Sequence, residues 1–409
     1  MKHKRLKKSL LLLITIILFL FLFCLNLKID SLKSEKNREL IFENKKINNI
    51  DEDRVDKSKI TLKSFNGFYQ SNYPIKNIES ITFTNTKPEI YDEYWFANIA
   101  NTSDIMGYRL GNSVYIVGNE INFNLNSQYM FSGVFWENLK EINGLDFIST
   151  KNVRYFTNMF YGLNSVKYLD VGTWDMSKAE DISFMFAFCT ALEYIDVSNW
   201  NVSNIRNFSG LFEGHSNTGD MSLKEIDVSK WNTSSAVYMN HVFYGCSQLE
   251  YIDISNWDVK NVVTFSHMFA DCYNLKELNF SKWETLSVKT FDAFLNDCHS
   301  LKRIDVSGLD TATCEQFSQM FESCINLEEI IGLENFDTSN ANNFAFCEMF
   351  HCCKKIKKIN VSSFNTHNAD NMVRMFAKCY ELEELDISHF DFSNIVYKDE
   401  MFLDTKKIF

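Results

Sequence analysis

Residues Leu192–Trp200 read Leu-Glu-Tyr-Ile-Asp-Val-Ser-Asn-Trp, and residues Leu249–Trp257 repeat this stretch with Ile in place of Val. The shared phrase is L-x-x-[LI]-D-[VI]-S-x-[WF]. The phrase occurs ten times, with first residues at Leu139, Val166, Leu192, Leu223, Leu249, Leu275, Leu301, Leu327, Ile356 and Leu382. Six of the nine spacings between successive copies are 26 residues. A fixed period of this length predicts supersecondary units that stack on one another to bury a shared core.

The second half of each unit carries apolar residues at helical spacing. Ile182, Met185, Phe186 and Cys189 fall at positions i, i+3, i+4 and i+7, and most other units repeat the pattern. We therefore expect each unit to hold one short strand, a turn and about three turns of helix with one apolar face. Stacking would place parallel strands on one side and helices on the other.

The repeat resembles a known family in both of its halves. The phrase is similar to the leucine-rich-repeat phrase L-x-x-L-x-L-x-x-N, with an aromatic residue where Asn usually stands. Together, Met185-Phe186, Cys189 and residues 195–204 resemble the repeat of BspA-type leucine-rich-repeat surface proteins of bacteria, and the likeness extends over residues 130–409. Upstream segments such as Asn112–Gly118 resemble the segment that precedes the repeats in that family. The resemblance implies a cell-surface protein for adhesion or partner contact, and it names no ligand.

The fold class expected from these patterns is α/β, a leucine-rich-repeat solenoid of about ten strand-plus-short-helix coils with a small N-terminal cap region. The expected domains are a basic end with a hydrophobic signal anchor at 1–27, a polar stalk at 28–63, the cap region at 64–138 and the solenoid at 139–409.

The N-terminal segment decides the expected topology. Residues 10–27 carry no charge and reach about the minimum length of a membrane-spanning helix, and five basic residues precede them. An uncleaved signal anchor is the leading interpretation, while a cleaved signal peptide and lipid modification of Cys24 are the alternatives. In all three cases we expect the rest of the chain at the cell surface, outside the cytoplasm.

Charge limits the partners of this exported part. Of the 41 basic residues in the chain, the five before the hydrophobic segment leave 36 against 53 acidic residues, a net charge of −17. Nucleic acid and anionic membrane surfaces are therefore poor partners, and membrane contact is expected through residues 10–27 only.

Alternation along the strand phrase predicts the binding face. Ile195 and Val197 should point inward, whereas Tyr194, Asp196 and Ser198 should point outward. Stacking would form a tyrosine-rich column beside an aspartate column, a mixture suited to recognition. The candidate binding residues are Tyr168, Asp170, Tyr194, Asp196, Glu225, Asp227, Tyr251, Asp253, Arg303 and Asp305. Two alternatives remain: the aspartates could satisfy amides of turns or neighbouring strands, or the column could bind calcium.

Seven cysteines occupy one position of the repeat, namely Cys189, Cys246, Cys272, Cys298, Cys324, Cys353 and Cys379. Leu163 fills the same position in another unit, so these residues are interpreted as buried thiols. If disulfides form, Cys314, Cys347 and Cys352 are the better candidates. Zinc ligation is weakly supported because no C-x-x-C pair is present.

No catalytic motif appears. His241 and His267 could stack in consecutive units, although a solvated helix surface is the favoured interpretation of both. We expect no enzyme, no cofactor and no metal site. The predicted function is a membrane-tethered surface binding or adhesion protein whose partner is a protein or carbohydrate on a host, a neighbouring cell or matrix. The alternative is a structural or self-assembling envelope protein without a soluble ligand.

Overall fold

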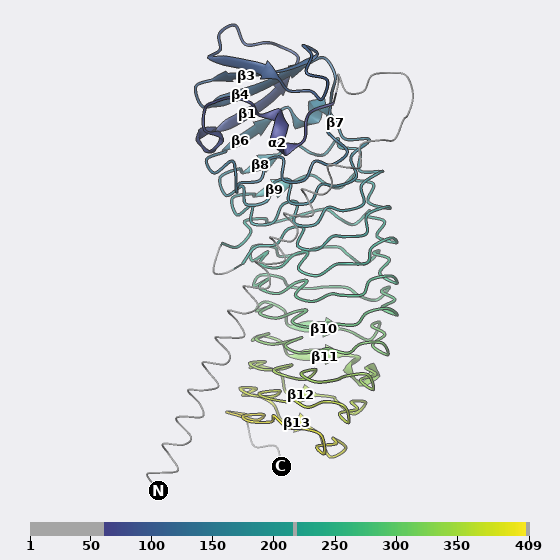
Figure 1. The fold of residues 1–409 in the computed structure, drawn as a ribbon. Helices are drawn as coiled ribbons and strands as arrows, with labels where there is room; N and C mark the ends of the chain where they lie inside the picture. Colours follow the sequence, from purple (N-terminus) through teal and green to yellow (C-terminus); the bar gives the residue numbers. More distant parts are fainter. Residues whose placement is uncertain (1–60, 216–218, 406–409) are drawn as a thin grey trace. The chain divides into compact units, whose positions relative to one another are not determined.

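The computed structural model describes residues 61–215 and 219–405 (Figure 1). The predicted signal anchor at residues 10–27 and nearly all of the predicted stalk lie outside these residues. Among the residues described, no helix has the length and apolar character needed to cross a membrane.

A five-stranded sheet forms the N-terminal part of the described chain (Figure 1). Its strand order is β2-β3-β4-β1-β6; β1 pairs in parallel with β4 and β6, and β3 pairs antiparallel with β2 and β4. The bounds are β1 Ser80–Thr84, β2 Glu93–Phe96, β3 Ile105–Leu110, β4 Ser113–Gly118 and β6 Glu141–Asn143, with short helices α2 Phe65–Phe68 and η3 Ile75–Asn77 nearby in sequence. Ile81 and Phe83 point into the core because strand alternation puts them on one face. This sheet falls mostly within the predicted cap region.

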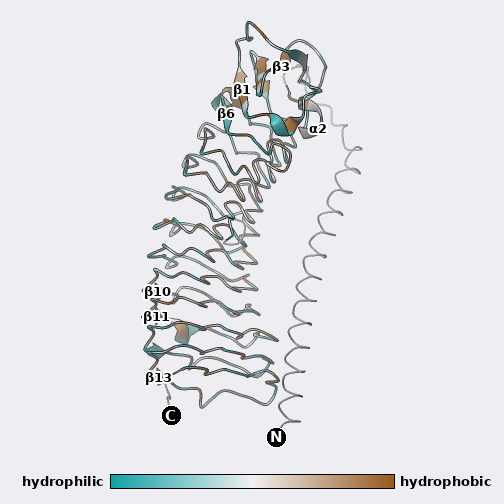
Figure 2. Cartoon of the chain, turned by 90° about the vertical axis from the view of Figure 1, so that its left-hand side faces the viewer, coloured by the Kyte–Doolittle hydropathy of each residue, from teal (hydrophilic) through white to brown (hydrophobic). Residues whose placement is uncertain are grey.

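The strands of the repeats are very short and pair only with parallel neighbours. Figure 2 shows β6, β10, β11 and β13 along one edge of the stack of units. The pairs are β5 (Ile121–Asn122) with β7 (Ile148–Ser149), β8 (Tyr168–Leu169) with β9 (Tyr194–Ile195), β10 (Arg303–Asp305) with β11 (Glu329–Ile331), and β12 (Lys358–Ile359) with β13 (Glu384–Leu385). Short 3-10 turns η4 (Leu145–Phe147) and η5 (Leu333–Asn335) follow β6 and β11. The predicted strand is confirmed in the phrases that begin at Leu139, Val166, Leu192, Leu301, Leu327, Ile356 and Leu382, whereas the phrases beginning at Leu223, Leu249 and Leu275 contain no strand.

The predicted helix in the second half of each unit is wrong. In residues 182–189 the chain forms successive tight turns, which we call the turn ribbon of the unit. Some N–H groups of the ribbon donate to the carbonyl three residues earlier in the chain, namely those of Met185, Ala187 and Cys189. Others donate to carbonyls of the next unit, namely those of Ile182, Phe184, Phe186 and Phe188. Ser183 donates to Asp181 Oδ1. Every amide of this segment is therefore bonded without a helical i−4 partner.

Left-handed residues make the turn ribbon possible. Phe184 has φ 55° and Phe188 has φ 58°, and most units repeat this pair four residues apart. A non-glycine residue in this region costs roughly 1–2 kcal/mol, which the bonds to the neighbouring unit offset. A four-residue turn period brings i, i+3, i+4 and i+7 to one side of the chain, so the apolar pattern imitates a helix.

The core consists of stacked columns of like residues. Trp200, Trp231 and Trp257 lie nearly parallel, with ring centroids 6.5 and 6.0 Å apart. Phe160, Phe186 and Phe212 form a second column, with centroids 5.5 and 5.4 Å apart. These columns bury the largest side chains of each unit against the same positions of its neighbours.

The cysteine column is buried, as the sequence predicts. Cys189 Sγ donates to the carbonyl oxygen of Phe160 at 3.1 Å, and burial raises the pKa of its thiol to about 12. The remaining members bond in the same way to the preceding unit. Cys314, Cys347 and Cys352, the better candidates if disulfides form, are free thiols in this structure.

Candidate functional site

Tyrosines of consecutive units lie in register on the strand side. Tyr168 of β8 pairs with Tyr194 of β9, and the neighbouring Leu169 and Ile195 point into the core. The residues Tyr168, Tyr194 and Tyr251 keep 54%, 46% and 52% of their surface exposed. The predicted outward direction of this column is therefore confirmed.

The other predicted residues also reach the surface of this face. Glu225, Asp227, Asp253, Arg303 and Asp305 are exposed, and Asp170 and Asp196 are half-buried. Four of them lie outside any strand, namely Glu225, Asp227, Tyr251 and Asp253. We call the ten residues together the strand face. Their exposure makes them available to a partner, and their role in binding stays a prediction.

The aspartates of the strand face close the turn that follows each strand phrase. Asp253 Oδ1 accepts the Ser255 N–H at 3.0 Å and the Ser255 Oγ–H at 2.7 Å, and Asp196, Asp227 and Asp305 make the same pair of bonds. Hydrogen bonds to the ionised form lower the pKa of Asp227, Asp253 and Asp305. The interpretation that these residues satisfy turn amides is confirmed for these four positions; the calcium alternative stays untested.

Alternating charges border the tyrosine column. Lys167 pairs with Glu193 at 3.1 Å and Lys276 pairs with Glu250 at 2.5 Å, in each case across neighbouring units. Lys276 Nζ also lies 5.1 Å above the ring of Tyr251. These exposed pairs contribute little to stability, but they give the face fixed donors and acceptors beside its aromatic rings.

A hollow opens at the N-terminal end of the strand face. It has a volume of about 460 Å³ and is lined by Lys140, Glu141, Ile142, Asn143, Ser165, Lys167 and Tyr168. Desolvation, followed by the nearby Asp170 carboxylate, raises the pKa of the Tyr168 hydroxyl. The two lysines and Ser165 were not predicted from the sequence, although their positions next to the tyrosine column in the first two units could have indicated them.

The two histidines noted in the sequence do stack. The rings of His241 and His267 lie 4.9 Å apart on the turn ribbons of consecutive units. Burial lowers the pKa of His267 to about 4, and His241 adds to this effect. The interpretation as a solvated helix surface is wrong, because the segment is not helical and these rings are largely covered.

A family model covers the repeats. The family described as "Mycoplasma protein of unknown function, DUF285" matches residues 125–224, 216–332 and 295–408, which is more than half of the 409-residue chain. The chain belongs to the DUF285 family. It is a leucine-rich-repeat-like protein of this family, and its matched region coincides with the stacked units. No curated protein sequence is significantly similar to the chain.

Three solved structures are similar to this DUF285 chain at low sequence identity. A leucine-rich repeat protein from Bacteroides ovatus is 13% identical, with 88% of this chain and 90% of that chain covered and a TM-score of 0.27. The ectodomain of the Arabidopsis thaliana receptor kinase GASSHO1/SCHENGEN3, solved with CASPARIAN STRIP INTEGRITY FACTOR 2, is 12% identical over 70% and 39%, with a TM-score of 0.20. The functional domain of InlJ from Listeria monocytogenes, which includes a cysteine ladder, is 14% identical over 69% and 63%, with a TM-score of 0.15. At these scores none of the three superposes closely on the chain.

Proposed function

We propose that this protein is a surface-exposed binding protein: a leucine-rich-repeat solenoid whose strand face contacts a protein or carbohydrate partner, without catalytic chemistry. The observation that carries the proposal is the exposure of Tyr168, Tyr194 and Tyr251 on one face. The fold does not require tyrosine there, because Glu225 and Arg303 occupy the same position in other units. Exposed tyrosines supply rigid contact area that gains free energy when a partner removes it from water.

The chemistry of the face favours a partner that offers both apolar surface and hydrogen-bonding groups. The hollow beside Tyr168 has room for one protein side chain or one sugar ring, with Lys140, Lys167 and Ser165 as donors. The aspartate column would steer positively charged groups toward the face. The resemblance of the repeat to BspA-type surface proteins supports the same class of function.

The proposal places the stacked units outside the cytoplasm. The uncharged residues 10–27 and the five basic residues before them would hold the chain in a membrane as a signal anchor. The polar residues that follow would separate the folded part from the bilayer.

The test measures binding of the full chain, held in detergent, to immobilised matrix proteins and glycans. A Tyr168→Ser/Tyr194→Ser/Tyr251→Ser variant should lose binding to the probe that the wild type captures. The matched control changes Tyr238, Tyr380 and Tyr397 to Ser; these are 47%, 48% and 52% exposed and lie outside the strand face. Equal loss in both variants, or unchanged binding in the first, would contradict the proposal.

Sedimentation of the same samples distinguishes self-assembly of the chain from binding of a ligand. If the wild-type chain forms concentration-dependent assemblies and the strand-face variant is monomeric, the face binds copies of the chain rather than a ligand. A wild type that stays monomeric while it binds the probe supports the binding function.

A further inference from the structure

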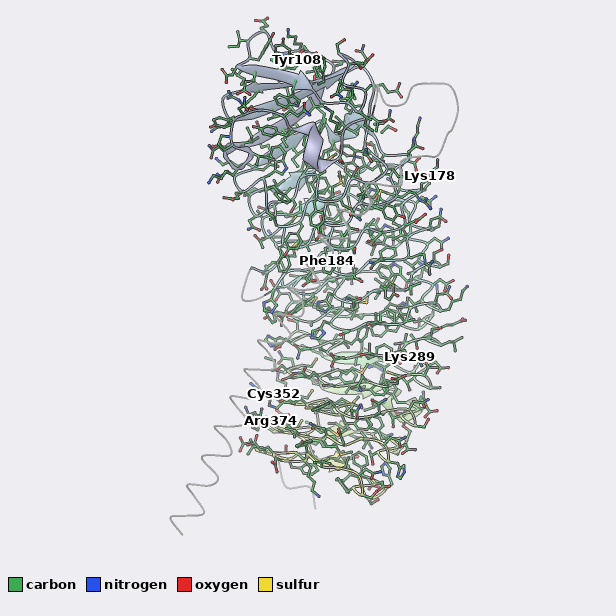
Figure 3. The ribbon with its side chains drawn as sticks, viewed as in Figure 1. Tyr108, Lys178, Phe184, Lys289, Cys352 and Arg374 are labelled. Carbon is green, nitrogen blue, oxygen red and sulfur yellow. The ribbon has the colours of Figure 1, made fainter. Side chains whose placement is uncertain are left out.

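A cluster of possible metal ligands lies on the turn ribbons, away from the strand face. Within the described part of the chain, Glu322, Glu348 and His351 form the group in which one ligand atom from each residue lies within 4.8 Å of the others. Their side chains are only 15%, 20% and 13% exposed. Figure 3 shows Cys352 and Arg374, which adjoin this group, on the same edge of the stack.

Stacking of two turn ribbons brings these residues together. The N–H of Phe321 donates to the Met349 carbonyl at 3.0 Å, and that of Ser323 donates to the His351 carbonyl at 2.7 Å. These bonds hold Glu322 beside residues that lie 26 and 29 positions later in the chain. Glu348 has φ 56°, the left-handed conformation of the turn ribbon. The ligand atoms therefore come from two units fixed by backbone bonds.

Neighbouring amides already orient the two carboxylates. Gln319 Nε2 donates to Glu322 Oε2 at 2.5 Å and to Glu348 Oε2 at 3.1 Å, and Asn296 Nδ2 donates to Glu322 Oε2 at 3.0 Å. The opposite oxygen of Glu322, Oε1, lies 3.0 Å from His351 Nδ1. The hydrogen bonds that would orient the carboxylate ligands of a metal ion are thus in place before any ion binds.

The second ring nitrogen of His351 has a partner of its own. Its Nε2 lies 3.4 Å from Cys352 Sγ. A metal ion on Nδ1 would leave Nε2 protonated, and this contact would then fix the ring in the metal-binding tautomer.

One cation competes for the cluster. Arg374 Nη1 lies 3.3 Å from Glu348 Oε1, but Arg374 Nε makes a shorter contact of 2.7 Å with Glu400 Oε2. Arg374 can therefore keep Glu400 as its partner while Glu348 turns to an ion.

We propose that Glu322, Glu348 and His351 bind one divalent transition-metal ion, with Zn²⁺ as the best-suited species. Two carboxylates balance its charge, and an imidazole ligand favours a borderline metal over Ca²⁺ or Mg²⁺. The ion links the units that begin at Leu301 and Leu327, so it stabilises the stack and does not depend on the proposed binding face.

The test titrates the untagged full chain, first stripped with EDTA, with Zn²⁺ by calorimetry and with Co²⁺ by visible absorption. The wild type should bind one ion, with a rise in Tm and with Co²⁺ bands more intense than those of the hydrated ion. Glu322→Gln, Glu348→Gln and His351→Asn should each weaken binding by more than about tenfold, and Gln319→Ala by roughly tenfold. The matched control is His241→Asn. His241 Nδ1 also lies near a carboxylate, 3.7 Å from Glu213 Oε2, but among the described residues it belongs to no group of three possible ligands.

Arg374→Ala keeps the proposal falsifiable if a ligand variant fails to fold. Removing the competing cation should tighten Zn²⁺ binding severalfold, a gain that misfolding does not produce. The proposal is overturned if the wild type shows no saturable binding, if His241→Asn weakens binding as much as His351→Asn, or if Arg374→Ala weakens it.

Discussion

The indole Nε1 of Trp231 donates a hydrogen bond to the carbonyl oxygen of Val197, 3.0 Å away in the preceding unit. Four other tryptophans, Trp174, Trp200, Trp257 and Trp283, make the equivalent bond. Each of these side chains therefore packs in the core and joins two units through a polar contact.

Replacing Trp231 should separate the contribution of core packing to stability from that of the indole hydrogen bond. Trp231→Phe keeps an aromatic ring in the column but loses the Nε1 bond, and it should lower the free energy of unfolding by about 1–3 kcal/mol. Trp231→Ala should cost roughly 3–5 kcal/mol because it also leaves a cavity. Denaturant unfolding measures both. Tyr238→Phe, at an exposed position, should change stability by less than about 0.5 kcal/mol. A Trp231→Phe variant as stable as the wild type would show that the indole bond contributes nothing.

The aspartates of the strand face should make the fold sensitive to acid. Their bonds to serine hold the pKa of Asp227, Asp253 and Asp305 below the ordinary value of 3.8. The stabilisation is therefore complete above that pH and is lost as the pH falls through the folded-state pKa. A triple Asp→Asn variant keeps the acceptor oxygens, as Asn279 does naturally with Ser281. We expect similar stability at pH 7 and a shallower loss below pH 4.

Thermal unfolding between pH 7 and pH 3 compares the triple variant with the wild type. An Asp253→Ala variant is the control, since it removes the acceptor and should lower stability at pH 7 by about 1 kcal/mol. Identical acid profiles for the triple variant and the wild type would mean that these carboxylates do not control acid stability.

His267 should produce a second effect at higher pH. Its ring is held neutral by burial, with a pKa of about 4 against an ordinary 6.5. Because only the unfolded chain takes up this proton between those values, stability should fall from about pH 6.5 downward and level off near pH 4. His267→Asn should flatten this part of the profile. His367→Asn is the control, since His367 is exposed and pairs with Asp391. Parallel loss of stability in the wild type and in His267→Asn would contradict this role of His267.

The sequence predicted the contents of the core better than the path of the backbone. The Cys189 column and the inward direction of Ile195 follow from the repeat alone, because a position that recurs every unit must meet itself in a stack. The turn ribbon at residues 182–189 could not be distinguished from a helix by apolar spacing, since both arrangements place the same residues on one side. The left-handed residues of such ribbons include Phe184 in this unit and His241 in a later one, so glycine does not mark these positions in the sequence.

Of the two candidate sites, one could be predicted from the sequence and the other could not. The exposed tyrosines could be predicted because alternation along one phrase determines their direction. The cluster of Glu322, Glu348 and His351 could not, because its members come from different positions of two neighbouring units. Only the register between turn ribbons reveals that these positions meet.

The most direct test of the central claim places a photo-activated cross-linking amino acid at position 194 or at position 238 of the full chain. Both native tyrosines are about half exposed, Tyr194 on the strand face and Tyr238 outside it. In the presence of a probe that the wild-type chain binds, irradiation should link the probe to position 194 and leave position 238 unlinked. Cross-linking at position 238 with none at position 194 would contradict the claim that the strand face is the binding surface.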